Sequence, residues 1–190
     1  MNYTAEDIEL NAKEDIELYE EFINGDKEAF NEIIRKYRRS LILFIMRLVK
    51  NKEVAEDIAQ DAFVYILMNK EEYNTKYSFK TYLYTIAKCR AMNHIKKERK
   101  IIPFDEAYIK EVEEEIVEES ILENESKREL YETLRKLKKS QQIVVYLKEI
   151  EGLRYKEISK ILNKTETEVK MIGYRGRKRL EKLIRKEEEK

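Results

Sequence analysis

The sequence predicts an all-α protein of two small helical domains joined by an acidic flexible linker, the second ending in a helix-turn-helix. Three observations support this fold class. One proline and four glycines in 190 residues leave few turns for a β-fold. Glu, Lys, Leu and Ile, which favour helix, are abundant. Apolar residues recur at spacings of three and four. The predicted domains span residues 1–100 and 126–190, with the linker at 101–125.

The formal net charge of zero results from four blocks of alternating sign. Residues 1–32 carry a balance of −9 and residues 33–100 one of +9. Residues 101–126 return to −9, and residues 127–190 carry +9. Two basic modules on an acidic connection indicate two contacts with nucleic acid.

The composition also excludes several classes of protein. The single cysteine, Cys89, rules out an internal disulfide and fits a reducing cytoplasm. The longest apolar run, residues 41–46, is far shorter than the roughly 20 residues of a membrane span. His94 is the only histidine, there is no Cys/His cluster, and there is no glycine-rich phosphate loop. We therefore expect no catalytic residue, metal, cofactor or small-molecule substrate.

The first domain is predicted to be a bundle of three or four helices with a basic rim. Gly25-Asp26 is typical of a helix stop followed by an N-cap. The first predicted helix has its apolar stripe over 30–48 and is followed by a break at Asn51. A second helix ends near Asn69, and residues 70–77 form a loop. Ser78 caps a third helix that runs to about Arg99.

The linker allows two interpretations. Val112, Ile116 and Ile121 keep a rough helical period, so part of it can be helical in place. With so little apolar area it is expected to be mobile when free. It is either a solvated connection or a segment with a function of its own.

The second domain begins near Ser126 with a helix to Lys139. Ser140 is predicted to cap an amphipathic helix that reaches Ile150. Gly152 then occupies the left-handed position of a Schellman motif, which folds Leu153 back on Leu147.

The chain then follows the pattern of a helix-turn-helix. Residues 155–162 form a short helix, residues 163–164 turn, and Thr165 with Glu168 forms a capping box that opens the last helix. Val169, Gly173, Gly176 and Leu180 share its packed face, where the glycines allow a neighbouring helix to approach closely. The opposite face carries Lys170, Tyr174, Arg177 and Lys178, flanked by Arg175 and Arg179. This face reads duplex DNA or is simply a solvated basic surface.

A second pattern interleaves aromatic and basic residues over 73–100. Aromatic rings stack on unpaired bases while Lys and Arg hold phosphates, which is how single strands are bound. The alternative is that half of the rings fill the core, and Phe79, on a stripe with Leu83 and Ile86, is predicted to do so. The rings are Tyr73, Tyr77, Phe79, Tyr82 and Tyr84, and the cations are Lys76, Lys80, Lys88, Arg90, Lys96, Lys97, Arg99 and Lys100.

Several segments resemble bacterial RNA polymerase sigma factors, closest to the extracytoplasmic-function (ECF) group. The resemblance covers about residues 20–100 and 126–185. The matching segments are Gly25-Asp26 with Ala29-Phe30, the stretches 55–63 (AEDIAQDAF) and 81–87 (TYLYTIA), and, in the second domain, 149–158 (EIEGLRYKEI) and 169–180.

This resemblance implies a subunit that binds core RNA polymerase and directs promoter recognition and DNA opening. Contacts with the β′ clamp helices would come from Asp57, Gln60, Asp61 and Phe63; the β flap is a further expected contact. Helical spacing places Asp57, Gln60 and Asp61 on one face, although an ordinary acidic face would look the same. The resemblance assigns Tyr73, Tyr77, Tyr82, Lys88, Asn93, Lys96 and Lys97 to the minus-ten element. It assigns Lys170, Met171, Tyr174, Arg175, Arg177 and Lys178 to the minus-thirty-five element.

Partners follow from the resemblance as well. It implies that the protein is cytoplasmic and that its partners include promoter DNA and an anti-sigma factor. A membrane-anchored anti-sigma factor could hold the protein at the membrane. Tyr82 stands where the family generally has Trp, and residues 168 and 171–174 depart from the family's usual recognition helix, so promoter sequence does not transfer.

Other readings stay open from the residues themselves. The chain could be an autonomous helix-turn-helix regulator, although it has no evident dimerisation helix, or a helical adaptor for acidic proteins. Cys89 is expected to be a small buried side chain, and His94 a surface residue rather than a ligand.

Overall fold

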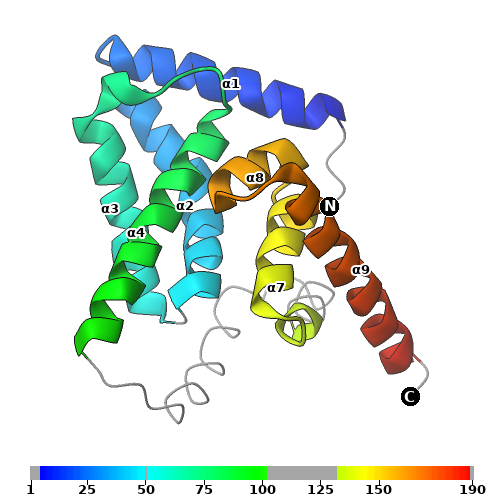
Figure 1. Ribbon diagram of the computed structural model, residues 1–190. Helices are drawn as coiled ribbons and strands as arrows, with labels where there is room; N and C mark the ends of the chain where they lie inside the picture. Colours follow the sequence, from blue (N-terminus) through cyan, green and yellow to red (C-terminus); the bar gives the residue numbers. More distant parts are fainter. Residues whose placement is uncertain (1–4, 50, 102–131, 189–190) are drawn as a thin grey trace.

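The computed structural model describes residues 5–49, 51–101 and 132–188, and within these ranges every regular element is helical. The first module consists of α1 (Ala5–Ile23), α2 (Lys27–Val49), α3 (Lys52–Met68), the short 3₁₀ helix η1 (Lys70–Glu72) and α4 (Phe79–Ile101). In Figure 1, α1 lies across one end of the bundle that α2, α3 and α4 form. The predicted linker, residues 101–125, lies outside the described residues apart from Ile101.

The second module contains one helical turn at 132–135, then α7 (Lys139–Val145), the π-helix η4 (Tyr146–Ile150), α8 (Tyr155–Leu162) and α9 (Glu166–Glu188). α9 packs on α7 and α8, and α8 packs on α4 of the first module. The all-α prediction is confirmed for the described residues, but the long helix α1 was not predicted.

Local capping signals explain where most helices begin and end. Asp26 Oδ1 accepts from the N–H of Glu28 at 2.8 Å, and Asn51 Oδ1 accepts from Val54 N–H at 3.0 Å. Gly25 has φ +107, which allows the sharp turn between α1 and α2. The predicted stop and cap before α2 and the break before α3 are both confirmed.

The start of α7 differs from the prediction. Its N-cap is Lys138, whose N–H donates to Gln141 Oε1 at 3.4 Å, so the assignment of Ser140 as N-cap is wrong. The backbone turns before Lys138, where Leu137 N–H bonds to Leu134 O at 3.1 Å. That turn leaves Ser140 inside the first turn of the helix.

The close of the second helix is as predicted, with one extra residue in its last turn. Gly152 has φ +71, and Leu153 N–H bonds to Leu147 O at 3.0 Å. Glu151 N–H bonds to Tyr146 O at 3.0 Å, five residues back rather than four, because η4 is a π-helix.

The two modules share one apolar core rather than standing apart. Phe44, Tyr84 and Tyr146, from α2, α4 and η4, are fully buried in the same cluster. The Tyr146 hydroxyl donates to Ser40 O at 3.0 Å, and the Arg47 guanidinium lies 3.8 Å from the Tyr146 ring centroid. The second module is therefore fixed against α2 by buried polar as well as apolar contacts.

The predicted close approach at the glycines of α9 is confirmed. A Cβ built on Gly173 would lie 3.2 Å from Tyr155 Cε1, and one on Gly176 only 2.7 Å from Val145 Cγ2. α8 and α7 thus pack directly against the backbone of α9.

We expect Gly176→Ala to lower the stability of the protein. Overpacking costs about 1–3 kcal/mol, which outweighs the roughly 1 kcal/mol that alanine gains in helix propensity. Thermal unfolding followed by circular dichroism should show a clear fall in melting temperature. Gly173→Ala, whose contacts are looser, should lose less. A Gly176→Ala protein as stable as the parent would refute the packing argument.

Candidate nucleic-acid interface

Three tyrosines, from α1, the loop before α4 and the first turn of α4, pack against one another in the first module. The Tyr73 ring lies 5.3 Å from that of Tyr82 and 4.8 Å from that of Tyr19, between centroids. The Tyr73 hydroxyl donates to Tyr77 O at 2.9 Å, which closes the loop over residues 73–77. Burial raises the pKa of both Tyr73 and Tyr82 to about 12, so these phenols stay neutral.

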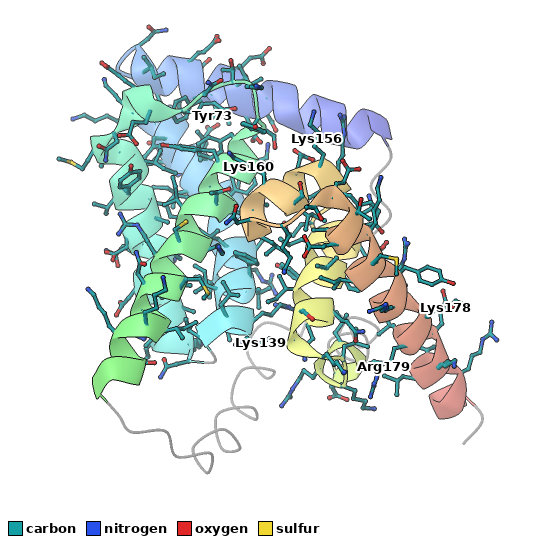
Figure 2. All side chains as sticks on the ribbon, viewed as in Figure 1. Tyr73, Lys139, Lys156, Lys160, Lys178 and Arg179 are labelled. Atoms are coloured by element: carbon teal, nitrogen blue, oxygen red, sulfur yellow. The ribbon has the colours of Figure 1, made fainter. Side chains whose placement is uncertain are left out.

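The remaining aromatic residues of the pattern are divided between core and surface. Phe79 and Tyr84 are fully buried, so the prediction that Phe79 fills the core is confirmed. Tyr73, Tyr77 and Tyr82 are half-buried. Tyr77 lies under α8, with Lys160 Nζ 5.1 Å from its ring centroid. Figure 2 shows Tyr73 and Lys160 in this region of the molecule.

α4 carries the predicted basic residues on a face that α2 does not cover. Asn93, Lys96 and Lys97 are exposed and Lys88 is half-buried. Cys89 is exposed too, so its expected burial is wrong. It occupies the helical position one turn before Asn93, on the solvent side of α4.

His94 makes a contact typical of a helix surface. Its Nε2 lies 3.1 Å from Glu98 Oε1, one turn along α4. In the part of the chain that the structure describes, no group of three or more His, Cys, Asp or Glu side chains could hold a metal ion.

α3 presents the predicted polar face. Asp57, Gln60 and Asp61 are exposed, opposite the buried Ile58 and Ala62. Asp61 Oδ2 lies 3.7 Å from Arg90 Nη1 of α4, a solvent-exposed and therefore weak pair.

Phe63 does not share that face. Only 5% of it is exposed, and its ring meets that of Phe30 at 6.5 Å between centroids. Its helical position lies on the side that packs on α2. The structure therefore removes Phe63 from the surface available to a partner.

Three exposed apolar residues extend the α3 face and were missed by the sequence reasoning. Val64, Leu67 and Met68 are 48%, 47% and 76% exposed. Val64 and Met68 follow Asp57 at seven and eleven positions, which places them on the same side of the helix. This spacing could have shown that these apolar residues lie on the exposed face. They were missed because, in the sequence, apolar residues beside a core stripe cannot be told apart from core residues.

The exposed face of α9 carries the residues predicted to meet duplex DNA. The capping box that opens it is confirmed, since Thr165 N–H donates to Glu168 Oε2 at 2.8 Å and Glu168 N–H to Thr165 Oγ1 at 3.2 Å. The Thr165 hydroxyl also donates to Glu168 Oε2 at 2.7 Å. The bonds that this carboxylate accepts from the side chain and the backbone N–H of Thr165 hold the pKa of Glu168 below its usual value. Among the residues predicted to face DNA, Arg177 is half-buried, and the exposed ones are Lys170, Met171, Tyr174, Arg175, Lys178 and Arg179.

Local pairs order part of this face. Lys170 Nζ lies 2.7 Å from Glu166 Oε1, and Arg177 Nη1 lies 3.3 Å from Glu149 Oε1. A hydrogen bond with Tyr174 raises the pKa of Lys178, whose Nζ is 4.9 Å from the Tyr174 ring centroid. Figure 2 shows Lys178 and Arg179 on α9, at the edge of the molecule remote from α3.

Comparisons with known proteins agree with both halves of this arrangement. The family model for Sigma-70 region 2 matches residues 33–101, and that for Sigma-70, region 4 matches residues 127–180. RNA polymerase sigma-H factor from Pseudomonas aeruginosa is 26% identical over 92% of this chain and 96% of its own length. ECF RNA polymerase sigma factor SigW from Bacillus subtilis is 29% identical over 85% of this chain and 91% of its own.

The chain belongs to the ECF group of RNA polymerase sigma factors. Members of this group are not enzymes: they direct RNA polymerase to promoters at the start of transcription. This membership decides against the autonomous regulator and the adaptor.

The fold has a parallel among solved structures. CnrH, solved in complex with the cytosolic domain of CnrY, matches this sigma factor with a TM-score of 0.61 over 90% of this chain and 97% of its own. At 19% identity, this likeness concerns the fold alone. Among the helices that the structure describes, none is both long and apolar enough to cross a membrane.

The buried hydroxyl of Tyr82 generates a stability prediction. It has no hydrogen-bond partner among the described residues, whereas the Tyr84 hydroxyl donates to Ser40 Oγ at 3.0 Å. Tyr82→Phe should therefore leave the free energy of unfolding unchanged or raise it by up to about 1 kcal/mol.

Tyr84→Phe is the matched variant and should lower the same free energy by about 1 kcal/mol, because it removes a satisfied buried bond. Urea unfolding of the two proteins measures both changes. The assignment of the two hydroxyls fails if Tyr82→Phe is the more destabilising substitution.

Proposed function

We propose that this sigma factor opens promoters by using two separate surfaces for two forms of DNA. The α9 face, comprising Lys170, Met171, Tyr174, Arg175, Arg177 and Lys178, reads the duplex of the minus-thirty-five element. The rings of Tyr73, Tyr77 and Tyr82 and the α4 residues Lys88, Asn93, Lys96 and Lys97 take the melted minus-ten strand. The observation that carries this proposal is the exposure of a capped basic helix on one module and, on the other, of basic residues along α4 with half-buried tyrosines at the start of that helix.

The α3 face is the proposed contact with the β′ clamp helices of core polymerase. It joins exposed carboxylates and an amide, at Asp57, Gln60 and Asp61, to the apolar side chains of Val64, Leu67 and Met68. An apolar patch with a polar margin is the usual composition of a protein interface. The second module would meet the β flap, as the family resemblance implies.

An anti-sigma factor is the proposed regulator. The solved complex of the sigma factor RpoE with the anti-sigma factor NepR from Bartonella quintana supports a partner of that class for this chain, which is 17% identical to that sigma factor. The protein would act in the cytoplasm, where core polymerase and DNA meet, and a membrane-anchored partner could hold it at the membrane.

In vitro transcription with purified core polymerase and fragmented genomic DNA tests the role and provides the promoters. In this assay, the double variant Gln60→Ala with Asp61→Arg should lose activity. Its affinity for core polymerase should fall by about tenfold or more, since charge reversal at a well-placed contact costs upwards of ~1.4 kcal/mol. Fluorescence titration with core polymerase measures this affinity.

Glu71→Arg is the matched control because it makes the same charge reversal at an exposed residue of η1, off the α3 face. It should bind core polymerase like the parent, and all proteins should keep the parent's helical spectrum. Equal binding by the double variant and the parent would remove α3 from the interface.

Met171 and Tyr174 are expected to read thymine methyl groups in the minus-thirty-five duplex. Both are about half exposed on α9, and apolar side chains recognise the thymine C5-methyl in the major groove. Replacing thymine by deoxyuridine removes only that methyl and should weaken binding, on the order of fivefold. Gel-shift titration of promoter duplexes from the transcription assay measures the effect.

In Met171→Ala or Tyr174→Ala this discrimination should shrink, whereas Arg175→Ala should weaken all duplexes alike through a lost phosphate contact. Full thymine–uracil discrimination in both alanine variants would show that these side chains do not read the methyl.

A further inference from the structure

A carboxylate from the second module is bound at the start of α4 in the first. Glu157 Oε1 accepts from Ser78 Oγ at 2.7 Å and from Thr81 Oγ1 at 3.0 Å. Its other oxygen accepts from Arg154 N–H at 2.9 Å, at the start of α8. The charge therefore lies between the N-terminal ends of two helices, where the helix dipoles favour an anion.

A second carboxylate is bound next to it. Glu151 is only 8% exposed, and its Oε2 lies 2.7 Å from Lys80 Nζ. The same ammonium donates to the Glu151 backbone oxygen at 2.8 Å and lies about 6 Å from the ring centroids of Tyr37 and Tyr84. Because a buried charge is costly unless paired, this contact depends on the two modules staying together.

The groups that bind these carboxylates are of the kinds that bind phosphate in proteins. Hydroxyls, an ammonium and a helix N-terminus bind any oxyanion of suitable size. They follow Tyr77 directly in the chain, and α8 also places Lys160 over the Tyr77 ring. A single DNA strand presents phosphates and bases side by side, and here phosphate donors adjoin the rings proposed to stack on bases.

The two DNA surfaces cannot both be engaged while the modules are in contact. Elements named for positions minus ten and minus thirty-five lie about 25 base pairs apart, or ~85 Å at 3.4 Å per pair. A compact chain of this length has a radius of gyration of only about 16 Å. The connection formed by residues 102–131 could span up to ~100 Å if extended, so separation is sterically possible.

We propose that Glu151 and Glu157 occupy, in the closed chain, the surface of Ser78, Lys80 and Thr81 that takes backbone phosphates of the melted promoter strand. α8 and the strand compete for this surface, so the free sigma factor is held shut and strand binding opens it. The inference rests on the proposed minus-ten surface and adds to it a phosphate site and an internal competitor.

Opening can be measured in the full chain with two spin labels, one on the exposed Cys89 and one on Arg179→Cys in α9. The parent should give one short distance between the labels. Glu151→Gln with Glu157→Gln should give a longer and broader distribution. Glu149→Gln is the matched control, because Glu149 pairs with Arg177 inside the second module, and it should keep the parent distance.

Strand affinity is measured on unlabelled full-length proteins with a fluorescent single-stranded oligothymidylate. The double glutamine variant should bind it about tenfold more tightly than the parent. Lys80→Met should lengthen the label distance but gain no affinity, because it breaks the contact and removes a phosphate donor together. A methylphosphonate strand, which has no backbone charge, should show no gain with any variant.

Three results for the double glutamine variant would overturn the inference: an unchanged label distance, a longer label distance without tighter strand binding, or the same gain in affinity with the uncharged strand. A variant that melts below the assay temperature is replaced by the single Glu151→Gln, for which the same outcomes apply. The transcription assay tests the proposed polymerase role separately from this competition. If the parent failed to direct core polymerase while distances and affinities changed as expected, the proposed polymerase role would fail and the competition would stand.

Discussion

Helix α2 packs against helices of both modules, and the placement of these helices depends on it. Its neighbours are α1, α3 and α4 on the first module and α7 on the second. Its backbone takes part directly, since Ser40 O accepts from the Tyr146 hydroxyl and Leu48 O accepts from Lys139 Nζ at 2.7 Å. A tyrosine buried as deeply as Tyr146 needs such a partner. Once η4 is fixed in this way, α8 meets α4, and α9 closes on the glycine contacts with α7.

Features that depend on local backbone geometry could be predicted from the sequence. The caps at Asp26 and Thr165, the break at Asn51 and the left-handed Gly152 are correct because each satisfies a requirement set within four or five residues. The error at Ser140 has the same origin: a serine can cap, but the turn before it had already started the helix.

Features that depend on which elements meet could not be predicted in this way. The family resemblance placed Phe63 at the polymerase contact, but it does not report which helix covers a side chain, and α2 covers this one. Cys89 was expected to be buried because a lone cysteine in a helix usually is, but its position on α4 faces solvent. The contact of Glu157 with Ser78 joins residues 79 positions apart, and no local signal reports it.

The π-helix η4 places one extra residue in the helix just before the contact between the modules. A π-turn holds one residue more than an α-turn, so the wider turn absorbs the extra residue and the side chains after it keep their direction. Deleting a single residue from η4 would therefore restore regular α geometry and leave Glu151 facing Lys80. Relatives that differ here by one residue would keep the same helices, the same exposed α9 face and the same contact between the modules.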